Sequence, residues 1–285
     1  ILRMNKIIIF AIIILILICF KKKESFGNVG FRMKILVPFY NPGPKLLDRC
    51  LRSIVNQTNT NYDVCIIDDA STKESHELKK VVLKYCHGRK NFHYIFKSEN
   101  KGTLHSNIIA MDKLKPKDHD VIIIVDGDDE LYNNRVFQKI EDAYKKNDIY
   151  TTFGNYYERT GDKMKKNGNY DALCKRDFKK MLQTNTVRKN WYGFTHLKTF
   201  KYKLFKNIKK SDLMRNGKYL KSATDVATMV PIFEMAGGKF KCFNEPLYIY
   251  TKDHPNSHHN NKKSFRGQTS NKDYVFSKPY YSPIV

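Results

Sequence analysis

The 285-residue sequence lacks several patterns that mark common classes of protein. Its six cysteines stand at positions 19, 50, 65, 86, 174 and 242 and form no C-x-x-C pair, so neither paired disulfide nor metal spacing is present. We therefore expect buried free thiols, which favours a reducing compartment. No zinc-finger spacing occurs, and no helix combines a basic stripe with interleaved aromatics. We predict no nucleic-acid partner.

The sequence also lacks an apolar run of the about 20 residues that an ordinary membrane-spanning helix needs. The longest run, residues 7–20, is followed by three lysines at 21–23. A secretory signal core fits this length, and residues 25–27 offer a small-x-small cleavage site, but the lysines separate the two. We predict an uncleaved single-pass membrane anchor within residues 1–30, with a cleaved signal as the alternative. Lysines flank both sides, so the orientation stays open.

The composition is strongly basic, with a formal net charge of +24, and 41% of the residues are hydrophobic. This apolar content suffices for a sizeable core, and the length fits one large α/β domain or two small ones. The charge is compatible with an anionic membrane or a phosphorylated substrate. Lysines spread over solvated surfaces explain it equally well.

A regular pattern fills the first half of the chain. Apolar, strand-like runs begin near residues 34, 63, 92 and 121, about 29 residues apart, which is the length of a βα unit with short loops. Helical spacing of apolar residues lies between them, at 45–56, 75–86 and 103–112. Four successive units predict a parallel sheet flanked by helices.

The second half is less regular. We expect a loop at 158–172, no clear period over 190–222, and a polar, partly disordered tail at 256–285. One main domain should therefore span 31–255. Its further elements are a helix at 134–147, a strand at 150–157, a helix at 225–236, and strands at 239–243 and 247–251.

The most informative stretch is residues 121–130, in which five branched apolar residues run into four acids and a glycine. The run reads as a buried strand, so Asp126, Asp128 and Asp129 should follow its carboxyl end. Open α/β sheets bind ligands at that edge. Because packed carboxylates repel one another, a cation should lie beside them, and all-oxygen ligation suits Mg²⁺ or Mn²⁺.

Five motifs occur in a fixed order: residues 35–41, 51–58 and 66–72, Asn100-Lys101-Gly102 with Asn107, and residues 126–129. In this order and spacing they resemble the motifs of family 2 glycosyltransferases of the GT-A fold. The resemblance covers about 34–255. It implies an α/β fold with a mostly parallel, Rossmann-like sheet flanked by helices.

The resemblance also implies roles for single residues. Asp126 would contact the ribose or sugar of a nucleoside diphosphate sugar, and Asp128 would ligate Mn²⁺ or Mg²⁺ bridging the diphosphate. The late histidine that often ligates the metal would be His254, with His258 and His259 as competitors for that role. A surface histidine on a flexible tail is the alternative. The remaining donor-binding residues would be Pro38, Tyr40, Asp69, Asn100 and Gly102.

The catalytic base of the family would be Asp225, which follows Thr224 where relatives often carry Glu-Asp. Asp also favours helix N-caps, and Asp225 begins a predicted helix, so a cap is the alternative role. As a base it would take the proton of an acceptor hydroxyl during an inverting displacement. Aromatic residues at 191–196 would lie on the acceptor side, although core packing explains them almost as well.

The resemblance thus predicts a metal-dependent inverting glycosyltransferase acting from UDP-hexose or UDP-N-acetylhexosamine on a glycan, protein or lipid. A catalytically inactive nucleotide-sugar binder or scaffold remains an alternative. A haloacid-dehalogenase-type phosphatase is disfavoured, because Glu130 stands where that pattern needs Thr or Val. An EF-hand loop starting at Asp126 fails, because Leu131 and Phe137 occupy the positions that need Gly and Glu.

Overall fold

The computed structural model describes residues 30–166, 174, 178–184, 186–189, 195–252 and 262–285. The fold lies in the unit Arg32–Val285. The apolar run at 7–20 and the predicted anchor lie outside the described residues. Within the described ranges, no helix is long and apolar enough to cross a membrane.

The four predicted βα units are confirmed in order and in spacing. Their strands are continuous and mostly buried, and their helices bury one stripe; in α2 the buried positions 47, 50, 51 and 54 follow the helical period. The elements are β1 (Met33–Phe39), α2 (Pro44–Val55), β2 (Tyr62–Asp68), α3 (Ser75–Cys86), β3 (Phe92–Phe96), α4 (Thr103–Leu114), β4 (Val121–Ile124), β5 (Glu130–Leu131) and α5 (Val136–Lys146).

Nine of the described strands form one mixed sheet in the order β3-β2-β1-β4-β8-β6-β11-β5, with β7 paired to β6. The first four are parallel, as predicted. β8 then pairs antiparallel with both β4 and β6, whereas β6 and β11 are parallel. The added strands are β6 (Thr151–Thr160), β7 (Lys163–Lys166), β8 (Thr199–Lys201) and β11 (Phe240–Thr251).

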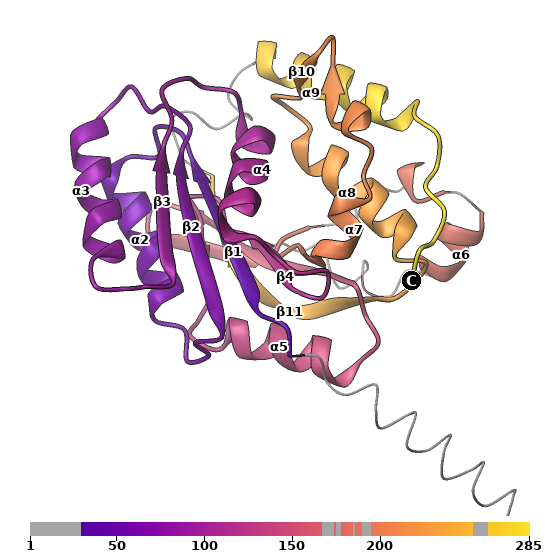
Figure 1. Ribbon diagram of the computed structural model, residues 1–285, viewed down its shortest axis with the longest axis horizontal. Coiled ribbons are helices and arrows are strands. Elements are labelled where there is room, and N and C mark those ends of the chain that lie inside the picture. Colours follow the sequence, from indigo (N-terminus) through magenta and orange to yellow (C-terminus); the bar gives the residue numbers. More distant parts are fainter. Residues whose placement is uncertain (1–29, 167–173, 175–177, 185, 190–194, 253–261) are drawn as a thin grey trace, which may run out of the picture. The chain divides into compact units, whose positions relative to one another are not determined.

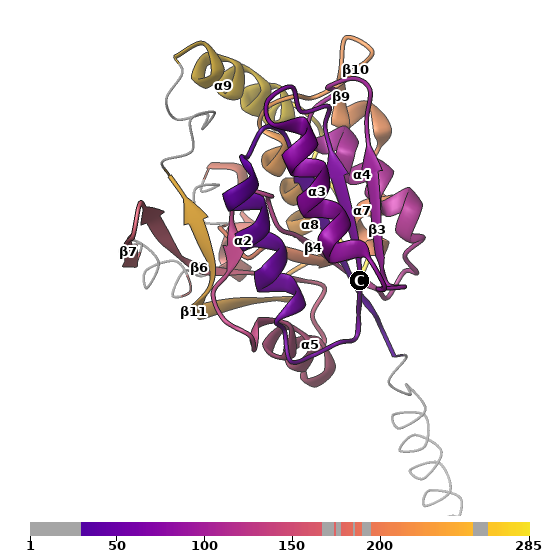
Figure 2. The same ribbon diagram turned by 90° about the vertical axis from the view of Figure 1, so that its left-hand side faces the viewer.

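Helices cover both faces of the parallel half (Figures 1 and 2). α2 and α3 lie on one face. On the other face, Leu36, Cys65 and Ile122 belong to one buried cluster with residues of α4 and of α8 (Thr224–Met235). Successive side chains of β1 point to opposite faces of the sheet, and both faces are covered. The strand is therefore a continuous apolar run rather than an alternating one.

Two expectations for the second half were wrong. The expected loop at 158–172 contains the end of β6 and the strand β7, and the two strands expected over 239–251 are one strand, β11, with register shifts. The polar tail at 256–285, which we expected to be partly disordered, contains helix α9 (Lys262–Phe276). The remaining elements are α6 (Phe178–Gln183) and, within the stretch 190–222 that showed no clear period, α7 (Tyr202–Lys206), a 3₁₀ helix (Lys210–Leu213), β9 (Met214–Arg215) and β10 (Lys218–Tyr219).

The prediction for the cysteines holds in part. Cys50, Cys65 and Cys86 are free thiols. Cys174 and Cys242 instead form a disulfide, with Cα atoms 5.4 Å apart. The two positions are 68 residues apart in the sequence, so no local spacing could indicate the pair.

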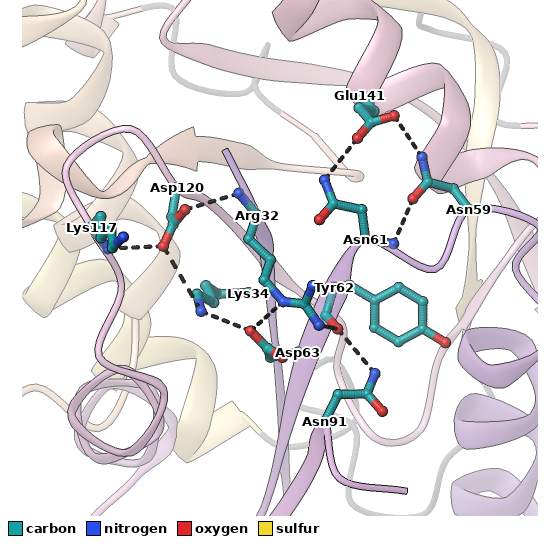
Figure 3. Close-up of polar contacts among 10 residues, drawn as sticks. All are labelled: Arg32, Lys34, Asn59, Asn61, Tyr62, Asp63, Asn91, Lys117, Asp120 and Glu141. Carbon is teal, nitrogen blue, oxygen red and sulfur yellow. Dashed lines mark hydrogen bonds and ion pairs between the residues drawn. The ribbon is translucent and has the colours of Figure 1, made fainter. Parts of the chain in front are cut away.

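A polar network joins the amino-terminal ends of the parallel strands (Figure 3). Asp63, at the start of β2, accepts hydrogen bonds from Arg32 Nε at 2.7 Å and Lys34 Nζ at 2.8 Å. Asp120, just before β4, accepts the backbone N–H groups of Arg32 and Lys117, each at 2.9 Å. Charged side chains therefore tie the starts of β1, β2 and β4 together, at the edge opposite to the acidic motif.

Candidate active site

The acidic motif lies at the carboxyl edge of the parallel strands, as predicted. Phe39, the last residue of β1, pairs with Asp68, the last residue of β2. The chain after β4 stays beside β1, because the N–H of Gly127 donates to the carbonyl of Pro38 at 3.0 Å. The loops that follow β1, β2 and β4 therefore open on the same edge, where open α/β sheets place ligands.

The loop after β1 is tied to the loop after β2 by Asn41. Asn41 has a φ of 49°, and its side-chain oxygen accepts the N–H groups of Thr72 at 2.8 Å and Lys73 at 2.9 Å. The neighbouring Tyr40 is 42% exposed, so an aromatic ring stands open at this edge. Pro38, the other predicted base contact from this loop, is buried in β1. The stacking role of Tyr40 stays a prediction.

Asp69 stabilises the loop that follows β3. Its carboxylate accepts the N–H of Gly102 at 2.8 Å and that of Lys101 at 3.1 Å, and it forms a buried ion pair with Lys97. This structural task was not predicted, and the predicted contact of Asp69 with a nucleotide base stays a prediction.

Gly102 and Asn100 join this loop to the segment before α8. Gly102 has a φ of 90°, and a Cβ there would lie 3.3 Å from the Cα of Lys221. The Nζ of Lys221 donates to the carbonyl of Asn100 at 2.9 Å. The loop that contains Asn100 and Gly102 and the amino-terminal end of α8 are therefore held close together.

The loop after β4 packs tightly against β1 at Gly127. A Cβ at this position would lie 2.6 Å from the Cβ of Phe39, so a larger residue would displace the loop. Asp126 and Asp128, on either side, are partly exposed. Burial, followed by the charge of Asp128, raises the pKa of Asp126 to about 7. The glycine therefore lets two repelling carboxylates sit at the end of β4.

Asp129 turns away from this edge and binds β11. It is 2% exposed; its carboxylate accepts the hydroxyl of Tyr248 at 2.9 Å and the N–H of Thr251 at 2.7 Å. The Tyr248 hydroxyl in turn accepts the N–H of Asp126 at 3.1 Å. Burial, with the charges of Asp128 and Asp126, raises the pKa of Asp129 well above its ordinary value. Asp129 and Tyr248 thus fix the loop that presents the other two acids.

Asp225 lies in the first turn of α8, and it is not the N-cap, which is Ala223. Its side chain is 50% exposed, and one carboxylate oxygen lies 3.3 Å from the Nζ of Lys198. The negative charge of Asp225 contributes to the raised pKa of Asp126, after burial and Asp128. Asp225 is therefore close enough to the acidic motif for its charge to act on Asp126, and the predicted alternative role as a helix cap is wrong.

An aromatic stack continues from this place along β11. The ring of His196 is stacked on that of Tyr248, with centroids 4.6 Å apart, and lies 6.0 Å from those of Tyr250 and Tyr156. Burial, and then the charge of Lys198, lower the pKa of His196 well below its ordinary value. Residues 191–194 of the predicted acceptor-side segment lie outside the described residues.

The carboxylate oxygens at this edge suit a metal ion, but the described residues do not supply a complete set of ligands. In the part of the chain that the structure describes, no three His, Cys, Asp or Glu side chains are grouped to hold a metal ion. Asp128, the predicted ligand, lies in the loop after β4. His254, the second predicted ligand, lies outside the described residues.

Sequence reasoning missed Lys198 and Tyr248. Lys198 is one of many lysines, and Tyr248 lies in an apolar run typical of any strand. Tyr248 is 119 residues from Asp129, and Lys198 is 27 from Asp225, so neither partner stands at a spacing that a local pattern could reveal.

The family profile described as glycosyl transferase family 2 matches residues 34–219, which is more than half of the chain. Among curated relatives, the glycosyltransferase GlyG of Streptococcus pneumoniae serotype 4 is 29% identical over 126 residues, covering 44% of this chain and 39% of the relative. The teichoic acid poly(glycerol phosphate) polymerase of Staphylococcus epidermidis is 30% identical over 100 residues, covering 35% and 13%. The matches thus span less than half of the length of these relatives.

Solved structures show the same fold at low identity. TarS 1–349 of S. aureus in complex with UDP-GlcNAc has a TM-score of 0.58 and 17% identity, covering 85% of this chain and 66% of that one. The mannosyltransferase PcManGT of Pyrobaculum calidifontis in complex with GDP-Man and Mn²⁺ has a TM-score of 0.53 and 14% identity, covering 86% and 70%. The likeness confirms the predicted GT-A fold.

Proposed function

Because this chain belongs to glycosyl transferase family 2, we propose that it transfers a sugar from a nucleoside diphosphate to an acceptor hydroxyl. The donor class that we favour is UDP-hexose or UDP-N-acetylhexosamine. TarS, which has a similar fold, was solved with UDP-GlcNAc, and this supports the choice of nucleotide. The acceptor would be a hydroxyl of a glycan, a protein or a lipid.

One observation carries the proposal: Lys198, which directly precedes β8 beside the end of β4, forms an ion pair with Asp225 in the first turn of α8. The charges of Asp128, Lys198 and Asp225 all act on the carboxyl group of Asp126. Asp126 and Asp128 come from the half of the sheet that opens as a nucleotide site, and Asp225 from a helix about a hundred residues later in the chain. A donor and an acceptor would therefore meet between them.

The chemistry assigned to these residues is a single displacement. Tyr40 would stack on the base, and Asp126 would bind the ribose or the sugar. Asp225 would remove the proton of the acceptor hydroxyl while its oxygen bonds to the anomeric carbon. The bond from that carbon to the diphosphate breaks, the nucleoside diphosphate leaves with the electron pair, and the configuration inverts.

We also propose that the reaction needs a divalent cation. Asp128 would hold Mg²⁺ or Mn²⁺ together with the donor phosphates, and the carboxylate oxygens at this edge fit such hard cations. The cation would neutralise the charge that develops on the departing diphosphate, an effect worth several kcal/mol. PcManGT, solved with GDP-Man and Mn²⁺, supports this assignment.

Residues 1–30 are proposed to anchor the protein in a membrane through the apolar run at 7–20. Such an anchor would bring the active site to acceptors at or near the membrane. The full chain should then stay with membranes after an alkaline wash, and its release by that wash would contradict the anchor.

The function is tested with the full chain and a panel of nucleotide sugars, by thermal stability and diphosphate release with and without Mn²⁺. A donor at 100 times its dissociation constant should stabilise the protein by about 2.7 kcal/mol. Asp128→Ala should lose the metal-dependent part of this shift and the release of diphosphate. Asp142→Ala, which alters a 45%-exposed carboxylate on α5, is the matched control and should behave as the wild type.

The outcomes separate the alternatives. Metal-dependent stabilisation by one donor, with diphosphate release, supports the proposed transferase. Stabilisation by a donor without release of diphosphate, whichever acceptor is supplied, would favour the inactive nucleotide-sugar binder. If no donor stabilises the protein with any metal, the proposed function is wrong.

A further inference from the structure

Lys198 reaches the carboxyl edge of the sheet through the pairing of β8 with β4. β8 is antiparallel to β4, with Lys201 opposite Val121 and Thr199 opposite Ile123. One further step in this register places Lys198 beside Ile124, the last residue of β4. The lysine therefore stands next to the start of the acidic loop, although it is more than 70 residues away in the sequence.

The side chain of Lys198 is unusually buried for a lysine. It is 12% exposed, and its Nζ lies 3.3 Å from Oδ2 of Asp225. Burial raises the pKa of Asp126, and the positive charge of Lys198 opposes that rise. A strongly hydrated ammonium is costly to bury without a charged or polar partner, and the carboxylate of Asp225 is such a partner.

Asp225 gains an orientation from this contact that its helix does not provide. The carboxylate is 50% exposed and does not cap α8. A half-exposed Asp side chain has several open rotamers, and an ion pair to a buried, fixed lysine selects one of them. Because Asp225 is half exposed, water can replace the lysine, so the pair should add little to folding stability.

From this placement we propose that Lys198 is a positioning residue: it holds the carboxylate of Asp225 at the end of β4, aimed at the place of the donor sugar. The inference rests on the proposed function, in which Asp225 is the base. A base acts efficiently only when its oxygen lies within hydrogen-bonding reach of the proton it removes. Lys198 would thus affect turnover and leave the binding of the nucleotide unchanged.

The test compares steady-state kinetics of the full-length wild type with Lys198→Met, Lys198→Arg, Asp225→Asn and the Lys198→Met/Asp225→Asn double variant. UDP release is followed with UDP-N-acetylglucosamine as the first probe, then with any other donor that stabilises the protein. Lys198→Met should lower kcat by up to about 10²-fold, the effect of a displacement of about 1 Å, with little change in the KM for the donor. Lys198→Arg should restore part of the loss.

The double variant distinguishes positioning from an independent role. If Lys198 acts through Asp225, the double variant should be no slower than Asp225→Asn alone, whose turnover should remain measurable at about 10²–10⁴-fold below the wild type. Lys206→Met is the matched control: Lys206 also forms an ion pair, with Asp118, but at the opposite edge of the sheet, before the start of β4. It should leave kcat unchanged.

Three results would overturn the inference while leaving the proposed function intact: full activity of Lys198→Met, a raised KM for the donor at unchanged kcat, or additive losses in the double variant. A raised KM would mean that Lys198 binds the donor directly. A wild type that binds none of the nucleotide sugars, or binds one and releases no diphosphate, would instead refute the proposed function and this inference with it.

Discussion

Three aspartates of one motif have different environments, although the sequence presents them as equivalent. Asp126 and Asp128 are partly exposed toward the candidate site, whereas Asp129 is buried and bonded to Tyr248 and Thr251 of β11. Gly127, whose missing side chain lets the loop pass against Phe39, lies between the two partly exposed acids. A strand followed by acids predicts a site, but it does not tell which acid is structural.

Tyr248→Phe should destabilise the protein by about 1–3 kcal/mol, because a buried carboxylate loses one hydrogen bond and the N–H of Asp126 loses its acceptor. Urea unfolding at neutral pH measures this change. Tyr94→Phe is the control: Tyr94 is 44% exposed on β3, and its substitution should change stability by less than about 0.5 kcal/mol. Equal, small changes in both variants would show that the Tyr248 hydroxyl does not stabilise the loop.

At the scale of elements, the pKa values of carboxyl groups shift in opposite directions at the two edges of the parallel strands. At the carboxyl edge, burial raises the pKa of Asp68, Asp126 and Asp129. At the amino edge, burial also acts to raise the pKa of Asp63, but hydrogen bonds and charges from Arg32 and Lys34 outweigh it, and the pKa is lowered. Ion pairs therefore hold the strands together at the amino edge, whereas the carboxyl edge holds acids with raised pKa values. Perturbed pKa values of this kind are expected at a functional site.

The lowered pKa of Asp63 predicts a pH-dependent contribution to stability. Because the folded pKa lies below the unfolded value of about 3.9, the contribution is complete above that value and is lost as the pH falls through the folded pKa. Asp63→Asn should therefore cost on the order of 1–2 kcal/mol at pH 7, reduced by the exposure of Arg32, and the difference should shrink below about pH 4.

Urea unfolding of the wild type and Asp63→Asn between pH 3 and 7 provides the measurement. Asp142→Asn, at an exposed pair with Lys146, should stay close to the wild type throughout. A stability difference for Asp63→Asn that is the same at pH 3 and pH 7 would contradict the assignment.

At the scale of the whole molecule, the end of the chain is part of the core. The guanidinium of Arg188 forms a buried, bidentate pair with Glu234 of α8, at 2.7 and 3.0 Å, and also donates to backbone carbonyls of residues 276, 278 and 279. Glu234 accepts the N–H of Tyr281, and the N–H of Ile284 binds the carbonyl of Met235. The chain end is thus bound to the helix that carries Asp225.

Arg188→Met should destabilise the protein by about 3–5 kcal/mol, because Glu234 would remain buried without its partner. The Arg188→Met/Glu234→Leu double variant should lose less than the sum of the single losses. Arg52→Met, which breaks an ion pair of a 62%-exposed arginine on α2, should cost less than about 1 kcal/mol. Denaturant unfolding separates these values, and a loss for Arg188→Met as small as that for Arg52→Met would show that the chain end does not depend on this pair.

The sequence by itself determined the four βα units, the edge at which the acids lie and the family, because each depends on local periods and on motifs a few residues long. It could not predict that β8 inserts between β4 and β6, that Cys174 bonds to Cys242, or that the last residues pack on α8. These depend on contacts between residues tens of positions apart. Only the tertiary structure decided that Tyr248 donates a hydrogen bond to Asp129 and that Lys198 pairs with Asp225. The burial of a side chain and its charged partner depend on which distant segments pack together.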